Sequence, residues 1–213
     1  MQLDVYSDMV CPWCYLGHRR LRMAIERLGG PAGSVELRWR AFQLDPAATS
    51  QPKDLRASID RKYGPGAFDS MTPRLVELGA AEGIDFRFDH AVRVGTFDAH
   101  RLLQWTQATT PHRADALAER LFRAYFAEGA NIADLDVLTR LSAEVGLDSD
   151  AAGDLLDGDG FAEVVRSDAA DALDAGVTGV PAVVYDGAVV IPGAQDLDTM
   201  EAVVRRLLAK VGG

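Results

Sequence analysis

Several features that mark other protein classes are missing from this sequence of 213 residues. Lysine occurs only three times and the formal net charge is −10, so a basic surface that follows nucleic-acid phosphates is not expected. No apolar run approaches the roughly 20 residues of a membrane span, and the first residues lack the basic start and apolar stretch of a signal peptide. The sequence therefore predicts a cytoplasmic protein that binds neither nucleic acid nor membrane.

Cysteine is also scarce, because the chain contains only Cys11 and Cys14. Structural disulfides are rare in a reducing cytoplasm, and a lone pair of cysteines there is more often catalytic or metal-binding. The two residues stand three apart in the segment "VCPWCYLGH", with a proline and a tryptophan between them. This segment is the first candidate for a functional site.

Alternating apolar and polar residues predict strands near both ends of the chain. They cover residues 2–6 and 35–40 at the front and residues 182–186 and 188–191 at the back. Asp186-Gly187 joins the last two runs and is a strong hairpin signal. A helical pattern between the first two strands and another after the hairpin complete an α/β arrangement.

The middle of the chain has the periodicity of helices, and pairs of proline and glycine bracket its segments. We therefore predict an α/β domain made of residues 1–48 and 176–213, interrupted by a helical domain at 49–175. The length of the chain is sufficient for a full hydrophobic core.

Proline is well suited to the first turn of a helix, so Pro12 predicts a helix that begins beside Cys11. Free N–H groups and the positive end of the helix dipole then favour a thiolate at Cys11. Cys14 lies one turn further along, near enough to form a disulfide and less exposed to a partner. This placement predicts an exposed attacking sulfur at Cys11 and a resolving sulfur at Cys14.

Two other interpretations of the cysteines remain open at this point. Cys11, Cys14 and His18 fall on one helical face and could contribute to a zinc site. A structural zinc ion needs four ligands, and the chain has no second cysteine pair to supply the rest. The cysteines could also be buried without a role, although a strand before the pair and a helix after it favour redox chemistry.

Four stretches spread over nearly the whole chain carry a family resemblance: "SDMVCPWCYLGHRRL", "RWRAFQLDP", "TFDAHRLLQW" and "GVTGVPAVVYDGAVVIPGAQ". In this combination the sequence resembles the thioredoxin superfamily. It is most similar to DsbA-type proteins of the FrnE-like branch, which are related to 2-hydroxychromene-2-carboxylate isomerases. The resemblance implies a thioredoxin-like fold with an inserted α-helical domain.

The resemblance also implies roles for individual residues. Pro181 would be a cis-proline beside the cysteines, Val180 would offer backbone groups to a substrate, and Pro12 and Trp13 would tune the redox potential. The alternative for Pro181 is an ordinary trans proline in a turn. Three further residues are candidates for the same cleft, each with a purely structural alternative: His18, His100 and Gln195.

The activity implied by the resemblance is thiol-disulfide exchange on a protein or small-molecule substrate. No bound cofactor is implied beyond the redox-active cysteine pair, with a low-molecular-weight thiol as a potential co-substrate. DsbA itself has histidine where this chain has Trp13, so a weaker oxidant is expected. Two alternatives stay open: a thiol-dependent isomerase of a small aromatic or polyketide-type molecule, which commonly lacks the second cysteine, and a redox-switched binding module or holdase.

Overall fold

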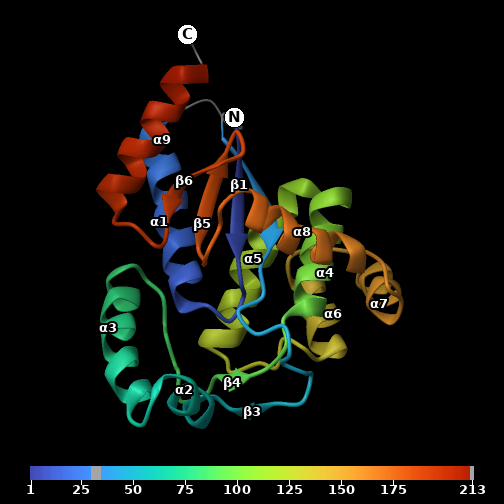
Figure 1. The fold of residues 1–213 in the computed structure, drawn as a ribbon. Coiled ribbons are helices and arrows are strands. Elements are labelled where there is room, and N and C mark those ends of the chain that lie inside the picture. Colours follow the sequence, from blue (N-terminus) through green and yellow to red (C-terminus); the bar gives the residue numbers. More distant parts are fainter. Residues whose placement is uncertain (30–34, 212–213) are drawn as a thin grey trace.

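The computed structural model describes residues 1–29 and 35–211 (Figure 1). The larger of its two sheets has four strands in the order β2-β1-β5-β6. The strands coincide with the four runs predicted from the alternating pattern, and that prediction is confirmed: β1 (Gln2–Ser7), β2 (Glu36–Ala41), β5 (Ala182–Tyr185) and β6 (Ala188–Pro192).

The two ends of the chain pair directly in this sheet. Strand β1 runs parallel to β2, with helix α1 (Pro12–Leu28) as the connection between them, and antiparallel to β5. Strands β5 and β6 form the predicted hairpin. Asp186 and Gly187 both have positive φ angles, 52° and 73°, which a tight turn between twisted strands requires.

Alternation along β1 divides the core between the two faces of the sheet, because successive side chains point in opposite directions. Leu3 and Val5 pack in the core that includes α1 and α9 (Leu197–Val211). Tyr6 packs on the opposite face with Ala172 and Ala182. Figure 1 shows α1 and α9 together on one side of the sheet and α8 on the other.

The segment between β2 and β5 is mainly helical, as predicted, with one small addition. Two strands of two residues each, β3 (Lys53–Asp54) and β4 (Val92–Arg93), form a second sheet that the sequence does not predict. The helices of this segment are α2 (Leu55–Tyr63), α3 (Ala67–Ala81), α4 (Phe97–Thr109), α5 (Pro111–Phe126), α6 (Leu135–Glu144), α7 (Ser149–Asp157) and α8 (Ala162–Asp174). None of the helices in the described part of the chain combines the length and apolar character that a membrane crossing requires.

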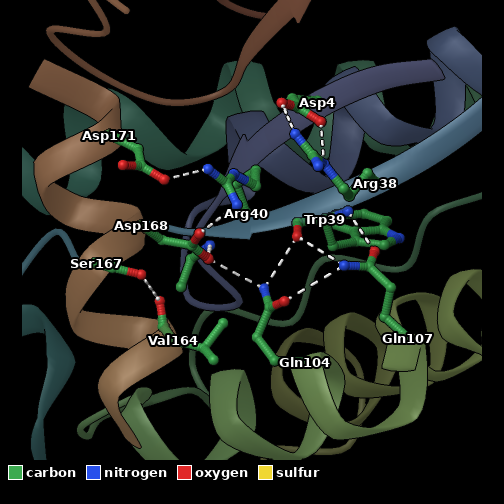
Figure 2. A network of polar contacts seen from close by, with 11 residues as sticks. Asp4, Arg38, Trp39, Arg40, Gln104, Gln107, Val164, Ser167, Asp168 and Asp171 are labelled. Carbon is green, nitrogen blue, oxygen red and sulfur yellow. Dashed lines mark hydrogen bonds and ion pairs between the residues drawn. The ribbon is translucent and has the colours of Figure 1, made fainter. Parts of the chain in front are cut away.

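A buried polar network joins α4 and α8 to the edge strand β2 (Figure 2). Asp168 is fully buried. Its carboxylate accepts hydrogen bonds from the backbone N–H of Ala41 at 2.7 Å and from the side-chain amide of Gln104 at 3.1 Å. Arg40 forms an ion pair with the same carboxylate at 2.9 Å. The network fixes two helices of the middle segment to the sheet on which the cysteine-bearing helix α1 packs.

Candidate active site

Helix α1 begins immediately after Cys11, as predicted from Pro12. Cys11 is the N-cap residue with extended backbone angles, and its carbonyl accepts hydrogen bonds from the N–H groups of Cys14 and Tyr15. Neither an acidic residue in the first turn nor a side-chain cap neutralises this helix end. The Cys11 sulfur therefore lies where the helix dipole and free N–H groups favour a negative charge.

Cys14 lies one turn further along α1 and is 1% exposed. Burial raises the pKa of the Cys14 thiol well above its usual range, and a hydrogen bond with Cys11 raises it further. Weaker opposing effects come from the Ser7 hydroxyl and the backbone of Asp8. Cys14 accordingly keeps its proton and can donate it toward the Cys11 sulfur.

The loop before β5 lies against the cysteine pair. The Val180-Pro181 peptide bond is cis, as the family resemblance implies. The Cys11 thiol faces the carbonyl oxygen of Val180 with a separation of 3.9 Å between sulfur and oxygen. A backbone acceptor is thus placed next to the candidate attacking sulfur.

The expectation that Cys11 is exposed is wrong, because only 4% of its surface reaches solvent. Access is through a cavity of about 420 Å³ whose wall includes Cys11 and its neighbours Pro12 and Trp13. Helices α2 and α3 supply the opposite wall, a contribution that the periodic pattern of these helices does not reveal. The other lining residues are Val10, Leu44, Asp45, Leu55, Ser58, Ile59, Lys62, Tyr63, Met71, Thr72, Leu75, Phe88, Arg93, Val94, Phe126 and Val180.

His100 lies away from this cavity. Its imidazole is 1% exposed and its Nε2 atom lies 3.5 Å from a carboxylate oxygen of Asp8, which is also 1% exposed. The Asp8 carbonyl accepts a hydrogen bond from the Cys11 N–H, and the second carboxylate oxygen accepts one from the N–H of Leu44. The sequence does not predict Asp8 as a site residue, although Asp8 connects His100 to the backbone that holds Cys11.

The other two cleft candidates also lie outside the cavity. His18 is buried between α1 and α5, with its Nε2 atom 3.7 Å from carboxylate oxygens of Asp115 and Glu119. Gln195 donates to the carbonyl of Pro192 and shapes the loop before α9. In the part of the chain that the structure describes, no three His, Cys, Asp or Glu side chains are grouped to hold a metal ion.

This geometry can be compared with known proteins. A family model described as a DSBA-like thioredoxin domain matches residues 2–205. The chain belongs to this family. The recognition of a DsbA-type protein, the thioredoxin-like α/β fold with inserted helices and the expectation of a disulfide oxidoreductase enzyme are thereby confirmed.

Individual relatives agree with this family. A probable DsbA oxidoreductase from Streptomyces coelicolor superposes with a TM-score of 0.89 at 30% identity, over 99% of this chain and 91% of that one. The uncharacterized protein YwbO of Bacillus subtilis is 28% identical over 96% of both chains. The cytosolic disulfide reductase DsbM of Pseudomonas aeruginosa shares the fold, with a TM-score of 0.70 at 22% identity over 99% of this chain and all of the other.

Proposed function

We propose that this DsbA-like enzyme exchanges disulfides through its C-P-W-C motif, with Cys11 as the attacking sulfur and Cys14 as the resolving sulfur. The observation that carries the proposal is the placement of Cys11 at the start of α1, in the wall of a cavity, with Cys14 behind it. The Cys11 sulfur, which substrate can reach, lies at a helix N-terminus that favours a thiolate. The inner Cys14 sulfur keeps its proton because burial raises its pKa.

The reaction proceeds in two exchanges. The Cys11 thiolate attacks one sulfur of the substrate disulfide, a mixed disulfide forms, and the first substrate thiolate leaves and takes a proton. Cys14 then loses its proton and attacks the Cys11 sulfur, which releases the second substrate thiol and leaves a Cys11–Cys14 disulfide. The substrate gains two electrons and the enzyme loses two, so a thiol reductant must restore the dithiol.

Within this proposal the bound substrate is held by the cavity and by the loop at Val180 and Pro181. The Val180 carbonyl is 3.9 Å from the Cys11 sulfur and offers a backbone acceptor to a substrate lying beside it. Pro12 and Trp13 line the cavity and would tune the cysteine pair. We assign His18, His100 and Gln195 to supporting positions, since all three lie outside the cavity lining.

We propose a reducing, cytoplasmic setting and the direction of a reductase or isomerase for this exchange. Trp13 in place of a histidine supports this direction, because no imidazolium then stabilises the thiolate and makes the disulfide a strong oxidant. The likeness in fold to a cytosolic disulfide reductase supports the same choice.

We also propose that the chain has two domains. The first is made of residues 1–48 and 176–213, and the second is made of residues 49–175. Residues 30–34 and 212–213 of the first domain lie outside the described residues. The sheet, α1 and α9 all come from the first part, which supports the division. Helices α4 and α8 of the second part pack on β2, so the two parts share their packing.

The experiment compares Cys11→Ser with Cys14→Ser on a disulfide substrate. Cys11→Ser should lose turnover, because a serine hydroxyl without an adjacent base is a far weaker nucleophile. Cys14→Ser should attack but not resolve, so a mixed disulfide should accumulate on a non-reducing gel. Equal behaviour of the two variants, without a trapped species, would falsify this assignment of roles.

A second candidate function is the thiol-dependent isomerisation of a small molecule, which the size and apolar lining of the cavity favour. The fold is also that of a 2-hydroxychromene-2-carboxylate isomerase, with a TM-score of 0.72 at 20% identity over 100% of this chain and 98% of that one. Cys14→Ser separates the two functions, because an isomerase that needs a single thiol would keep its turnover in this variant.

A further inference from the structure

We propose that the Cys11 cavity selects a small disulfide that has an aromatic or branched apolar body and one acidic group, which Lys62 binds. This inference rests on the proposed function in one respect, the role of Cys11 as the attacking sulfur. It adds a substrate class and a residue that recognises it.

The Cys11 sulfur can be reached only through its cavity. Only 4% of Cys11 is exposed, and it lies in the wall of a cavity of about 420 Å³. Pockets of roughly 300–1,000 Å³ are typical for small-molecule ligands. A disulfide in the flat surface of a folded protein cannot reach this sulfur without a group that protrudes into the cavity, whereas a small disulfide can enter whole.

The mouth of the cavity is apolar. Eight large apolar side chains are exposed among the described residues, and four of these line this one cavity. They come from separate parts of the chain, namely the start of α1, the loop after β2, the end of α2 and the middle of α3: Trp13, Leu44, Tyr63 and Met71. Exposed apolar residues concentrated at one place mark a binding surface.

The cavity lining carries a net positive charge. Three charged residues line the cavity, and two of these neutralise each other, because Arg93 donates to the carboxylate of Asp45 at 2.8 Å. Lys62 has no carboxylate partner within the described residues, and its ammonium group lies 5.2 Å from the centre of the Tyr63 ring. The lining therefore carries one uncompensated positive charge in a chain whose net charge is −10.

Restricted access, apolar walls and one free positive charge together indicate which disulfide substrate fits the cavity. The apolar walls favour a hydrophobic body, the ring of Tyr63 beside the ammonium favours an aromatic one, and Lys62 favours an anion at the mouth. In the exchange the probe disulfide gains two electrons and is released as two thiols, while Cys11 and Cys14 become a disulfide.

The test uses pre-reduced full-length enzyme in a single turnover with two chromogenic aromatic disulfides. Dithiobis(nitrobenzoic acid) carries carboxylates and dithiodipyridine is neutral at pH 7.5. Each probe is measured with wild type, Lys62→Met and Lys62→Glu, because the ratio of variant to wild type cancels the intrinsic reactivity of the probe. Lys53→Met is the matched control, since Lys53 lies in β3 and outside the cavity lining.

We expect Lys62→Met to slow the anionic probe about three- to fivefold, the effect of losing one partly exposed ion pair. Lys62→Glu should slow it further, high salt should reduce both effects, and neither variant should change the neutral probe more than about twofold. Lys53→Met should leave both rates unchanged. Equal effects of Lys62→Met on the two probes, or none on the anionic probe, would overturn the role of Lys62.

A second comparison tests the choice of a small substrate. Ser58→Trp adds a large ring to the cavity wall and should slow both small probes at least tenfold, with the circular dichroism of the wild type retained. Insulin represents a protein disulfide. For each disulfide, the rate with the enzyme is divided by the rate with dithiothreitol, and this ratio should be lower for insulin than for the neutral probe. Unimpaired small probes in Ser58→Trp, or a normalised preference for insulin, would contradict the inference. A failure of the proposed function is distinct, because wild type and Cys11→Ser would then react alike.

Discussion

The ring of Pro181 lies directly against Gly17 of helix α1. A Cβ atom built on Gly17 would come within 2.9 Å of the Cγ atom and 3.5 Å of the Cβ atom of Pro181, and the nearest backbone atom is the Cα of Ala194 at 3.6 Å. The helix that carries both cysteines and the loop that faces them therefore meet at a residue without a side chain. A side chain at position 17 would therefore collide with the ring of Pro181.

We predict that Gly17→Ala lowers the rate of disulfide exchange about tenfold, because the added methyl group must displace the ring of Pro181 and with it the Val180 carbonyl. Overpacking of this kind costs about 1–3 kcal/mol of unfolding free energy, which exceeds the gain of about 1 kcal/mol for alanine over glycine in a helix. Urea denaturation and the single-turnover rate measure the two effects.

Gly153→Ala is the matched control, because Gly153 lies inside α7 and a Cβ atom there has no neighbour within 4 Å. This variant should gain up to about 1 kcal/mol and keep full activity. If Gly17→Ala is as stable and active as Gly153→Ala, Pro181 is not packed tightly enough against Gly17 to matter.

Replacing Trp13 tests how the dipeptide between the cysteines sets the redox potential. We expect the wild type between about −270 and −150 mV, nearer to thioredoxin than to DsbA at about −120 mV. Trp13→His should move the potential in the oxidising direction, since an imidazolium beside the N-cap sulfur stabilises the thiolate. Equilibration with glutathione buffers measures both values.

Trp13→Phe serves as the control for this experiment, because it keeps an aromatic ring at the cavity mouth and adds no charge. Its potential should stay close to that of the wild type. A wild-type potential as oxidising as that of DsbA would refute the expected role of Trp13.

His18 should make stability depend on pH. Burial lowers the pKa of this imidazole, and the nearby carboxylates of Asp115 and Glu119 only partly offset the effect. A histidine in the unfolded chain titrates near about 6.5, so the unfolded state takes up the proton first. The stabilising contribution of neutral His18 is therefore present above about pH 6.5 and is lost as the pH falls toward the lowered pKa of the folded state.

His18→Gln should remove this contribution, so the loss of unfolding free energy between pH 7.5 and 5 should be smaller in this variant than in the wild type. His112→Gln, at an exposed position on α5, is the control and should retain the wild-type pH profile. If the unfolding free energy of wild type and of His18→Gln depends on pH in the same way, a group other than His18 causes the loss of stability at low pH.

Arg101 should be essential for stability although it lies outside the cavity. Its guanidinium is buried and donates to the carbonyls of Gly160, Leu155 and Gly158, and it also pairs with Asp98. A lysine ammonium is a compact charge, and it cannot donate to all three carbonyls in the way that the planar guanidinium does. Arg101→Lys should therefore cost about 2–4 kcal/mol, because buried carbonyls lose their donors.

Chemical denaturation of Arg101→Lys beside Arg166→Lys checks this expectation, since Arg166 is an exposed residue of α8 paired with Glu163. The control should change stability by less than about 0.5 kcal/mol. If the two variants are equally stable, the carbonyl contacts of Arg101 contribute nothing.

The sheet was predictable because its strands carry a local signal. In β1, Leu3 and Val5 alternate with polar positions, and Asp186-Gly187 specifies the hairpin turn without help from the rest of the chain. The helix start at Cys11 was predictable for the same reason, because Pro12 acts on its own turn. Strands β3 and β4 have two residues each and are too short to show any period.

The surroundings of the site could not be predicted in the same way. Cys11 is buried by α2, α3 and the loop after β2, all distant in sequence, and nothing in the C-P-W-C segment encodes these contacts. His100 and Asp8 are 92 residues apart, and their contact depends on how α4 packs beneath the sheet. In the sequence, long-range packing of this kind is visible only as apolar faces of helices. Such a face does not indicate which other element packs against it.

The pairing of β1 with β5 also imposes an order on biosynthesis. Strand β1 and helix α1, which begins at the cysteines, leave the ribosome first, while strand β5, which completes the site, follows about 175 residues later. At roughly 5–20 residues per second, Cys11 and Cys14 spend on the order of ten seconds without their final neighbours. The reactive pair is thus chemically accessible in the nascent chain before the site exists. It becomes enclosed in stages, first by the loop after β2, α2 and α3, and last by the loop at Val180 and Pro181.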